Sequence, residues 1–273
     1  MHQNELQNSP LGKTTSYIDK YDKSLLFPIA RSKQRYIELD KLPFKGWDIW
    51  NAYEISWLNK KGKPQIALAE FILPYDSPNL IESKSLKLYL NSLNNENFTS
   101  ETEVKNIIQQ DLSKEAGKEV TVKLYTETNC LLISHFPKAT NIDSIDIETN
   151  LYIADKDILT TNNVITEESL CSNLLKSNCP VTGQPDWASV FIQYKGNQIN
   201  HATLLKYIIS FRNYQEFHEQ CVEKIFLDIM DKCHPQTLTI YARYTRRGGL
   251  DINPIRTNDP RYILDNHFRM IRQ

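Results

Sequence analysis

Cys179 and Asp186 are the residues whose types and spacing best suit covalent and proton-transfer chemistry. A cysteine thiolate is a strong nucleophile, and a carboxylic acid on the same loop could fold back and supply a proton. Pro180, Gly183 and Pro185 predict a constrained loop between them, which is where reactive groups often lie. The pattern also fits a buried structural cysteine followed by an aspartate in an ordinary turn.

A basic segment, residues 243–249, is a second candidate for chemistry. Arg243, Arg246 and Arg247 precede a Gly248-Gly249 pair. Guanidinium groups bind phosphate through two parallel hydrogen bonds, and glycine lets backbone N–H groups approach an anion. The segment therefore predicts an anion site, although a solvated basic turn would have the same composition.

The cysteines predict free thiols rather than disulfides or a metal centre. Their number, 5, is odd, and no two have CxxC spacing. His218 and Cys221 could share a helix face, but no set of ligands has the spacing of a tetrahedral site. We therefore expect no metal. The cysteines are Cys130, Cys171, Cys179, Cys221 and Cys233.

The chain of 273 residues has a formal net charge of -1 and a hydrophobic fraction of 40%. This composition is ordinary for a globular protein and favours neither nucleic acid nor an anionic membrane as a partner. Residues 1–13 are polar and the apolar runs are too short to cross a bilayer, so we expect a cytoplasmic protein. The 8 glycines form neither GxGxxG nor GxxxxGK[ST], so any dinucleotide must be held without a Rossmann or P-loop site.

The first half of the sequence predicts the order strand, strand, helix, helix, strand. The strands are expected at residues 47–58 and 65–75, with a hairpin turn at 59–63. Pro78-Asn79 opens a helical pattern in which Leu86, Tyr89, Leu90 and Leu93 recur. A second helix at 101–114 and a strand at 120–125 follow.

The second half predicts a similar order of elements. A strand at 188–194 would turn back near Gln198 around Gly196-Asn197. A helix at 204–211 precedes a second helix with an apolar stripe that stops before Pro235, and a strand follows at 238–244. Two related α+β modules are therefore expected, with a boundary within 135–165. The stripe consists of Phe217, Cys221, Ile225 and Ile229.

Three segments resemble one enzyme family, the NADPH-dependent 7-cyano-7-deazaguanine reductases in their long, two-module form. The first is the ESKSLKLY string at 82–89, the most specific of the three. The second is LLKSNCP at 174–180, continuing to QPDW at 184–187. The third is FHEQC at 217–221, followed by YARYTRRGG at 241–249. The resemblance runs from Leu11 to Asn258 and leaves the last fifteen residues unexplained.

The resemblance implies an α+β chain of two tandem tunnelling-fold modules, each an antiparallel sheet with two helices packed on one face. The modules would be 1–150, with the ESKSLKLY motif, and 151–273, with the catalytic cysteine. It implies a homodimer that reduces the nitrile of a small purine-like molecule to an aminomethyl group, with two NADPH and no metal. The product would enter queuosine biosynthesis, a tRNA modification pathway, without direct contact with nucleic acid or membrane.

The resemblance also implies the site residues. Cys179 matches the covalent nucleophile and Asp186 the proton donor. Addition of a thiolate to a nitrile gives a thioimide, a better hydride acceptor. The positions that match substrate-binding residues are Ile81, Glu82, Ser83, His218 and Glu219. The positions that match NADPH-binding residues are Ser83, Lys84, Arg247 and Gly248.

Several of these residues have plainer alternatives. Glu82 follows Asn79 at the spacing of a capping box, and Glu219 could simply stabilise a helix N-terminus. Either carboxylate could instead accept hydrogen bonds from the guanine-like edge of the substrate. Lys84 and Lys87 also fit a solvated helix face.

Two other functions fit parts of the sequence. A pterin or GTP cyclohydrolase-like enzyme of the same fold would need a bound metal, whose ligands are not apparent. A non-catalytic RNA-binding module could use residues 243–249, but the near-neutral charge argues against it.

Overall fold

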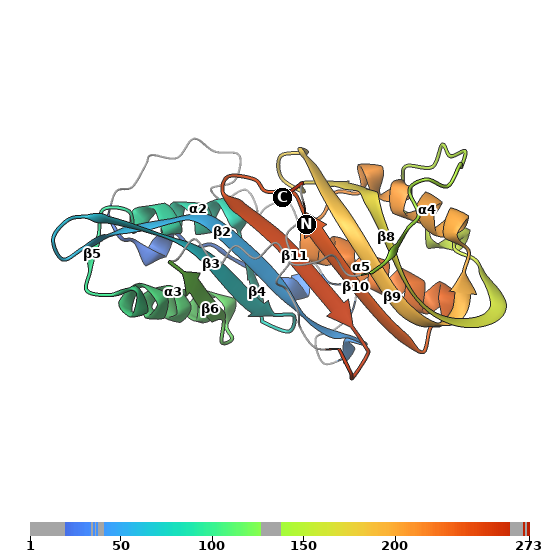
Figure 1. Cartoon of the computed structure of the whole chain (residues 1–273), viewed down its shortest axis with the longest axis horizontal. Coiled ribbons are helices and arrows are strands. Elements are labelled where there is room, and N and C mark those ends of the chain that lie inside the picture. Colours follow the sequence, from blue (N-terminus) through green and yellow to red (C-terminus); the bar gives the residue numbers. More distant parts are fainter. Residues whose placement is uncertain are drawn as a thin grey trace. The chain divides into compact units, whose positions relative to one another are not determined.

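The fold is described from a computed structural model, whose elements are labelled in Figure 1. The structure describes residues 20–33, 35, 37, 41–126, 138–262, 270, 272 and 273, so Cys130 lies outside it. The chain divides into two compact units. Unit 1 comprises Met1–Leu42, Trp47–Leu131 and Arg246–Asp251. Unit 2 comprises Pro43–Gly46, Leu132–Thr245 and Ile252–Gln273.

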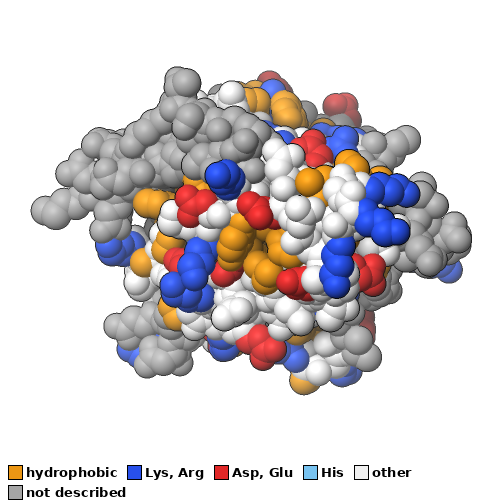
Figure 2. Space-filling view, turned by 90° about the vertical axis from the view of Figure 1, so that its left-hand side faces the viewer, with side chains coloured by type: hydrophobic (Ala, Val, Ile, Leu, Met, Phe, Trp, Pro, Cys, Tyr) orange, Lys and Arg blue, Asp and Glu red, His pale blue; other side chains and the backbone are white. Residues whose placement is uncertain are grey.

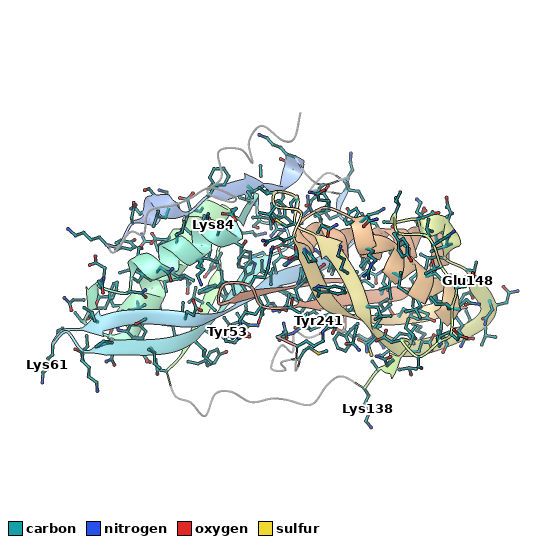
Figure 3. The ribbon with its side chains drawn as sticks, turned by 90° about the horizontal axis from the view of Figure 1, so that it is seen from above. Tyr53, Lys61, Lys84, Lys138, Glu148 and Tyr241 are labelled. Carbon is teal, nitrogen blue, oxygen red and sulfur yellow. The ribbon has the colours of Figure 1, made fainter. Side chains whose placement is uncertain are left out.

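Unit 1 contains an antiparallel sheet in the order β6-β3-β2. The expected turn between β2 and β3 is confirmed: the Asn59 side chain accepts the backbone N–H groups of Lys61 and Lys63 at 2.9 and 3.1 Å. Figure 3 shows α2 and α3 on the same side of these strands. The elements are η1 (Lys23–Leu25), β1 (Pro28–Ala30), η2 (Arg31–Lys33), β2 (Lys45–Asn59), β3 (Pro64–Pro74), β4 (Asn79–Ile81), α2 (Ser83–Ser92), β5 (Asn97–Phe98), α3 (Glu101–Ala116) and β6 (Thr121–Tyr125).

Unit 2 contains a second antiparallel sheet in the order β11-β10-β9-β8, with the short β7 parallel to β8. Helix α5 contacts β9 and β10, and α4 contacts β8. The sheet and helices of each unit confirm the α+β expectation. The elements are β7 (Thr140–Asn141), η5 (Lys156–Ile158), β8 (Thr161–Asn178), β9 (Pro185–Ile199), α4 (His201–Ser210), η6 (Phe211–Asn213), α5 (His218–Cys233), β10 (Thr237–Tyr244) and β11 (Leu250–Thr257).

The helix pairs of the two units are built alike. In each unit a helix of 10 residues precedes one of 16 residues. The Tyr89 hydroxyl of α2 donates to Asp111 of α3 at 2.8 Å, and the Tyr207 hydroxyl of α4 donates to Asp228 of α5 at 2.7 Å. All four side chains are buried. The repeat of element order that the sequence predicts therefore extends to a hydrogen bond between the paired helices.

The hairpin expected around Gly196-Asn197 is wrong. Strand β9 runs straight through both residues, and Gly196 pairs with Thr166 of β8. Glycine at 196 instead allows the backbone of Pro235 to pack closely against β9, because a Cβ there would lie 2.8 Å from the Cα of Pro235. Glycine marks tight contact between backbones as well as turns, and the sequence does not distinguish the two.

Other boundaries also differ from expectation. Strand β8 was not predicted, because its many polar residues obscure the alternation that identifies a strand. Strand β11 was not predicted, and residues 79–81 form β4 rather than the start of a helix. The apolar helix stripes are confirmed, since Leu86, Tyr89, Cys221 and Ile225 are all buried.

Helices long and apolar enough to cross a membrane are absent from the described residues. Figure 2 shows one face of the molecule, on which acidic and basic side chains are interspersed around a small apolar patch. This face matches the near-zero net charge of the chain.

Replacing Tyr207 with Phe should lower the free energy of unfolding by roughly 1.5–3 kcal/mol, because buried Asp228 loses a hydrogen bond to a charged group. Tyr89→Phe should have a similar effect through Asp111. Chemical denaturation measures both changes. Tyr152→Phe is the control, since Tyr152 is exposed. If Tyr207→Phe and Tyr89→Phe are as stable as the Tyr152→Phe control and the unaltered chain, the hydrogen bond between the helices contributes nothing to stability.

Candidate functional site

Cys179 lies at the end of the β8–β9 hairpin. Asn178 pairs with Pro185, and Ser177 pairs with Asp186. The Cys179 backbone closes the loop, because its N–H donates to Gln184 O at 2.8 Å and its carbonyl accepts the Gly183 N–H at 3.0 Å. Partners in an antiparallel ladder share a face of the sheet. Asp186 is therefore held beside the strand end from which Cys179 follows, as the sequence predicts.

The Cys179 and Asp186 side chains are both buried, each 4% exposed. Gln215 holds the Cys179 carbonyl from outside the hairpin, with its amide donating at 3.2 Å. Asp186 is better described as the second residue of β9 than as a loop residue. The loop expected up to Asp186 thus ends earlier, and a strand fixes the carboxylate.

His218 is brought against Asp186 from a different element. It is the first residue of α5, and its Nε2 lies 3.3 Å from Asp186 Oδ2. Its ring stacks on Tyr244, with centroids 3.8 Å apart and planes inclined by 5°. The opposite ring nitrogen, Nδ1, is buried without a hydrogen-bond partner among the described residues. Asp186 and Tyr244 are therefore the contacts that orient the imidazole.

The other described cysteines are poor nucleophiles. Burial raises the pKa of Cys221 to about 12 and that of Cys233 to about 11. Burial also raises the pKa of Cys171. A raised pKa lowers the thiolate fraction at neutral pH, and the thiolate is the reactive form. These residues and Cys179 are all free cysteines.

Glu219 lies in the first turn of α5 and is 3% exposed. A carboxylate at this position is favoured by the helix dipole, which agrees with the alternative that Glu219 simply stabilises the helix N-terminus. Gln220 completes the cap, because its side chain accepts the Phe217 N–H at 3.1 Å. The first turn of α5 therefore contains a buried carboxylate, Glu219, beside a neutral capping side chain, Gln220.

Glu82 is the N-cap of α2, and its carboxylate accepts the N–H groups of Lys84 and Ser85, both at 2.8 Å. A capping box that starts at Asn79 is wrong, because Asn79 lies in β4. Burial raises the pKa of Glu82, although the backbone hydrogen bonds oppose the shift. Ser83 begins the helix, so the structure places both residues at one helix end.

The corresponding cap in unit 2 is neutral. Asn200 caps α4, and its side-chain oxygen accepts the Ala202 and Thr203 N–H groups at 3.0 and 3.2 Å. The same hydrogen bonds are thus made without a charge. Capping explains the position of Glu82, but it does not explain why a buried carboxylate occupies it.

Arg247 and Gly248 lie at an exposed turn between β10 and β11. The Arg247 N–H donates to Leu250 O at 2.9 Å, and Gly248 has a positive φ of 56°. Lys87 of α2 donates to the Gly248 carbonyl, and its Nζ lies 2.7 Å from Glu54 Oε2. The turn is therefore fixed to the helix whose first turn carries Lys84 (Figure 3).

The basic segment is not a single anion site. Arg243 is 2% exposed, and its guanidinium donates to Gln273 and to Tyr241. Arg246 lies over the Tyr53 ring, 5.0 Å from its centroid. Arg246 and Arg247 are both exposed, so the expectation of an anion site is wrong for Arg243 alone.

The structure thus gathers the expected residues into two groups. Unit 2 holds Cys179, Asp186, His218 and Glu219 together at one end of the β8–β9 hairpin and α5. Unit 1 holds the others around the start of α2 and the exposed turn. Sequence reasoning missed the contacts of Lys87 and of Tyr244, although both residues lie in the quoted motifs. The unit 1 group consists of Ile81, Glu82, Ser83, Lys84, Arg247 and Gly248.

Clusters of three or more His, Cys, Asp or Glu side chains that could hold a metal are absent from the described part of the chain. The sequence likewise shows no tetrahedral ligand spacing. The residues that define the site are therefore a thiol, carboxylates, an imidazole and basic side chains.

Comparison with known proteins gives the same family that the sequence motifs resemble. Residues 17–124 match the family "Nitrile reductase, 7-cyano-7-deazaguanine-reductase N-term", and residues 185–262 match "QueF-like protein". Cys179 lies in neither matched range. The solved archaeosine synthase QueF-Like in the apo form has a TM-score of 0.31 and 13% identity, and it covers 36% of this chain and 95% of its own. A TM-score this low does not establish a common fold.

Full-length relatives are more informative. The NADPH-dependent 7-cyano-7-deazaguanine reductase of Paraburkholderia phymatum is 55% identical over 273 residues, covering 98% of this chain and 99% of the relative. The protein of the same name from Coxiella burnetii is 51% identical over 271 residues, covering 98% and 97%. The chain therefore belongs to the family of NADPH-dependent 7-cyano-7-deazaguanine reductases.

Proposed function

We propose that this protein reduces the nitrile of 7-cyano-7-deazaguanine to an aminomethyl group, with two NADPH, in queuosine biosynthesis. The observation that carries the proposal is the arrangement of Cys179, Asp186 and His218 in a chain of this family. A free cysteine follows the strand end at which a buried carboxyl group contacts an imidazole. This combination suits addition of a thiol to an unsaturated carbon with proton transfer to the neighbouring nitrogen.

Cys179 is the proposed nucleophile. Its sulfur forms a bond to the nitrile carbon while the nitrogen takes a proton, which gives a thioimide. NADPH supplies the hydrides that reduce this carbon. The sulfur leaves as thiolate before the second reduction, so the cysteine returns to its starting state. The raised pKa values of the other described cysteines support the choice of Cys179.

Asp186 is the proposed proton donor, with His218 as its partner. Carboxyl and imidazole share a proton-transfer contact of 3.3 Å. Asp186 is buried and the His218 side chain is 12% exposed, so the low local dielectric strengthens this interaction.

Glu82, with its neighbours Ile81 and Ser83 in unit 1, and Glu219, with its neighbour His218 in unit 2, are the proposed substrate-binding residues. A buried carboxylate can accept two hydrogen bonds from a guanine-like edge. The neutral cap at Asn200 supports this role, because it shows that helix capping does not require the charge of Glu82.

Ser83, Lys84, Arg247 and Gly248 are the proposed NADPH-binding residues. The exposed guanidinium and the glycine turn suit phosphate, and the contact between Lys87 and Gly248 holds the turn against α2. We further propose a homodimer of modules 1–150 and 151–273 that works in the cytoplasm and binds neither nucleic acid nor membrane.

Incubation with the nitrile and no NADPH should add one substrate mass per chain, on the peptide that contains Cys179. Cys179→Ala should lose both the adduct and turnover, because it removes the proposed nucleophile. Cys171→Ala is the matched control and should keep both. Intact-protein and peptide mass spectrometry measure the adduct. Its appearance on Cys171 or Cys221 would refute the assignment.

Glu82→Gln should weaken substrate binding about ten- to a hundredfold, the effect of losing a charged hydrogen bond of roughly 1.5–3 kcal/mol. Glu219→Gln should do the same. Titration of each folded variant with substrate measures the affinity. Unchanged affinity together with a lower melting temperature would favour a purely structural role for that residue.

Glu82→Gln should also change the pH dependence of stability. The pKa of Glu82 is raised in the folded chain, which therefore binds this proton more tightly than the unfolded chain. Glu82 accordingly reduces stability as pH rises from its usual pKa of 4.5 through the raised value. The Gln variant, which still caps α2, should lose this decline in denaturation experiments. Persistence of the same decline would show that another group causes it.

Proton transfer and NADPH binding should separate by mutation. Asp186→Asn keeps the shape but cannot release a proton, so adduct formation should slow by about 10²–10⁴. The NADPH Michaelis constant should change little. Stopped-flow measurement of adduct formation checks the first effect. If Asp186→Asn reacts near the normal rate, the proton comes from elsewhere, and His218 is the next candidate.

Lys84→Ala and Arg247→Ala should show the opposite pattern. Adduct formation precedes hydride transfer, so both variants should still form it. A phosphate contact exists in the ground state, so its loss should appear mainly as a higher Michaelis constant for NADPH. Lys61→Ala, at the exposed β2–β3 turn, is the control. A loss of adduct in Lys84→Ala would place that residue in the chemistry instead.

A further inference from the structure

The Gln273 side chain is buried, 8% exposed, and hydrogen-bonded at both ends. Its oxygen accepts from Arg243 Nε at 2.9 Å and from the Met270 N–H at 3.1 Å. Its nitrogen donates to Tyr244 O at 3.0 Å and to Asn253 Oδ1 at 2.8 Å. A side chain amide with this many partners is fixed in orientation.

These partners lie where β10 ends and within β11. Tyr244 is the last residue of β10 and pairs with Ala188 of β9. The next residue, Thr245, donates its N–H to Trp187 O at 2.9 Å. Tyr244 thus has its backbone fixed on one side by β9 and at its carbonyl by Gln273.

The Tyr244 ring is the surface on which His218 rests. The rings are nearly parallel, with centroids 3.8 Å apart. Tyr244 is fully buried, at 0% exposed, and its hydroxyl has no hydrogen-bond partner among the described residues. Close packing, rather than a hydrogen bond of the hydroxyl, therefore holds the ring in place.

His218 depends on that ring more than a histidine normally does. A functional imidazole is usually oriented by a hydrogen bond at the nitrogen that faces away from its partner. Nδ1 of His218 is buried and has no such partner among the described residues. The stack on Tyr244 therefore replaces the missing hydrogen bond in directing Nε2 at Asp186.

We propose that Gln273 and Tyr244 are positioning residues for the Asp186–His218 pair. Gln273 fixes the backbone of Tyr244, the Tyr244 ring fixes the His218 imidazole, and the imidazole is thereby held 3.3 Å from the Asp186 carboxylate. The inference rests on the proposed function for its catalytic consequence, but its geometric part stands separately. It gives a role to the end of the sequence, which the resemblance leaves unexplained.

The geometric part is tested by NMR of the His218 ring in isotope-labelled full-length chain. Gln273→Ala and Tyr244→Leu should shift or broaden the ring signals of His218, which a His218→Asn sample assigns. Tyr244→Phe keeps the ring and should keep the signals in place. Arg272→Ala is the matched control, because this neighbour is exposed and donates to Asn173 O at 2.8 Å.

The catalytic part is tested by the rate of adduct formation from the nitrile without NADPH. Gln273→Ala should slow it by about ten- to a hundredfold, the scale for a displaced catalytic group, while the Michaelis constant for NADPH stays unchanged. Arg272→Ala should match the unaltered chain. The double variant Gln273→Ala with Tyr244→Leu should be no slower than Tyr244→Leu alone, since both act through one path.

The outcomes separate the inference from the proposed function. Unchanged His218 signals in Gln273→Ala would overturn the inference, whatever the activity. Shifted signals with an unchanged adduct rate would overturn its catalytic consequence. A chain that forms no adduct at all, with shifted signals in Gln273→Ala, would refute the proposed function and leave the positioning of His218 established.

Discussion

The pairing of β8 with β9 is the constraint on which the candidate site of unit 2 depends. Ser177 faces Asp186 because the two strands are in that register, and a shift by one residue would turn the carboxylate to the other face of the sheet. Four successive pairs, from Leu175–Ala188 to Asn178–Pro185, hold this register, and a register shift between Ser172 and Leu175 separates them from the rest of the ladder. A carboxylate placed on a strand is held more firmly than one on a loop.

Burial sets the chemistry of the side chains around this hairpin. Cys221 and Tyr244 are pushed to their neutral forms by removal from water. They can therefore fill space and orient neighbours without adding charge. Cys179 is also buried, at 4% exposed, but it follows a strand end, where its backbone closes a tight loop and Gln215 donates to its carbonyl. The same residue type thus serves as structure at one position and as candidate nucleophile at another.

The two units show how repeated architecture can carry different functions. A tyrosine–aspartate hydrogen bond joins the helices of both, so the packing has been kept. The helix caps have not: Glu82 introduces a buried charge where Asn200 introduces none. Likewise the first turn of α5 carries buried Glu219, whereas the first turn of α3 carries exposed Glu101 after an ordinary Ser100 cap. Capping needs no buried charge, which supports the proposed role of Glu82 and Glu219 in substrate binding.

The sequence by itself determined the helices, most of the longer strands, the apolar helix faces and the family, and it named Cys179 and Asp186 as candidates for the chemistry. These follow from local periodicity and from short motifs whose residues are close in the chain. The sequence could not place β8, because its polar residues hide its alternation, nor distinguish the close approach at Gly196 from a turn. The position of β8 and the close approach at Gly196 depend on which segments pack against each strand.

Tertiary structure alone decided the contacts between residues far apart in the chain. Asp186 and His218, Tyr244 and Gln273, and Lys87 and Gly248 come from different elements, and no spacing rule joins them. It also removed Arg243 from the exposed basic turn, since this residue lies in β10, which is buried on both faces, and its guanidinium donates to Gln273. Sequence names the groups that can react, while strand register and packing decide which of them meet, because only the folded chain fixes distances between distant residues.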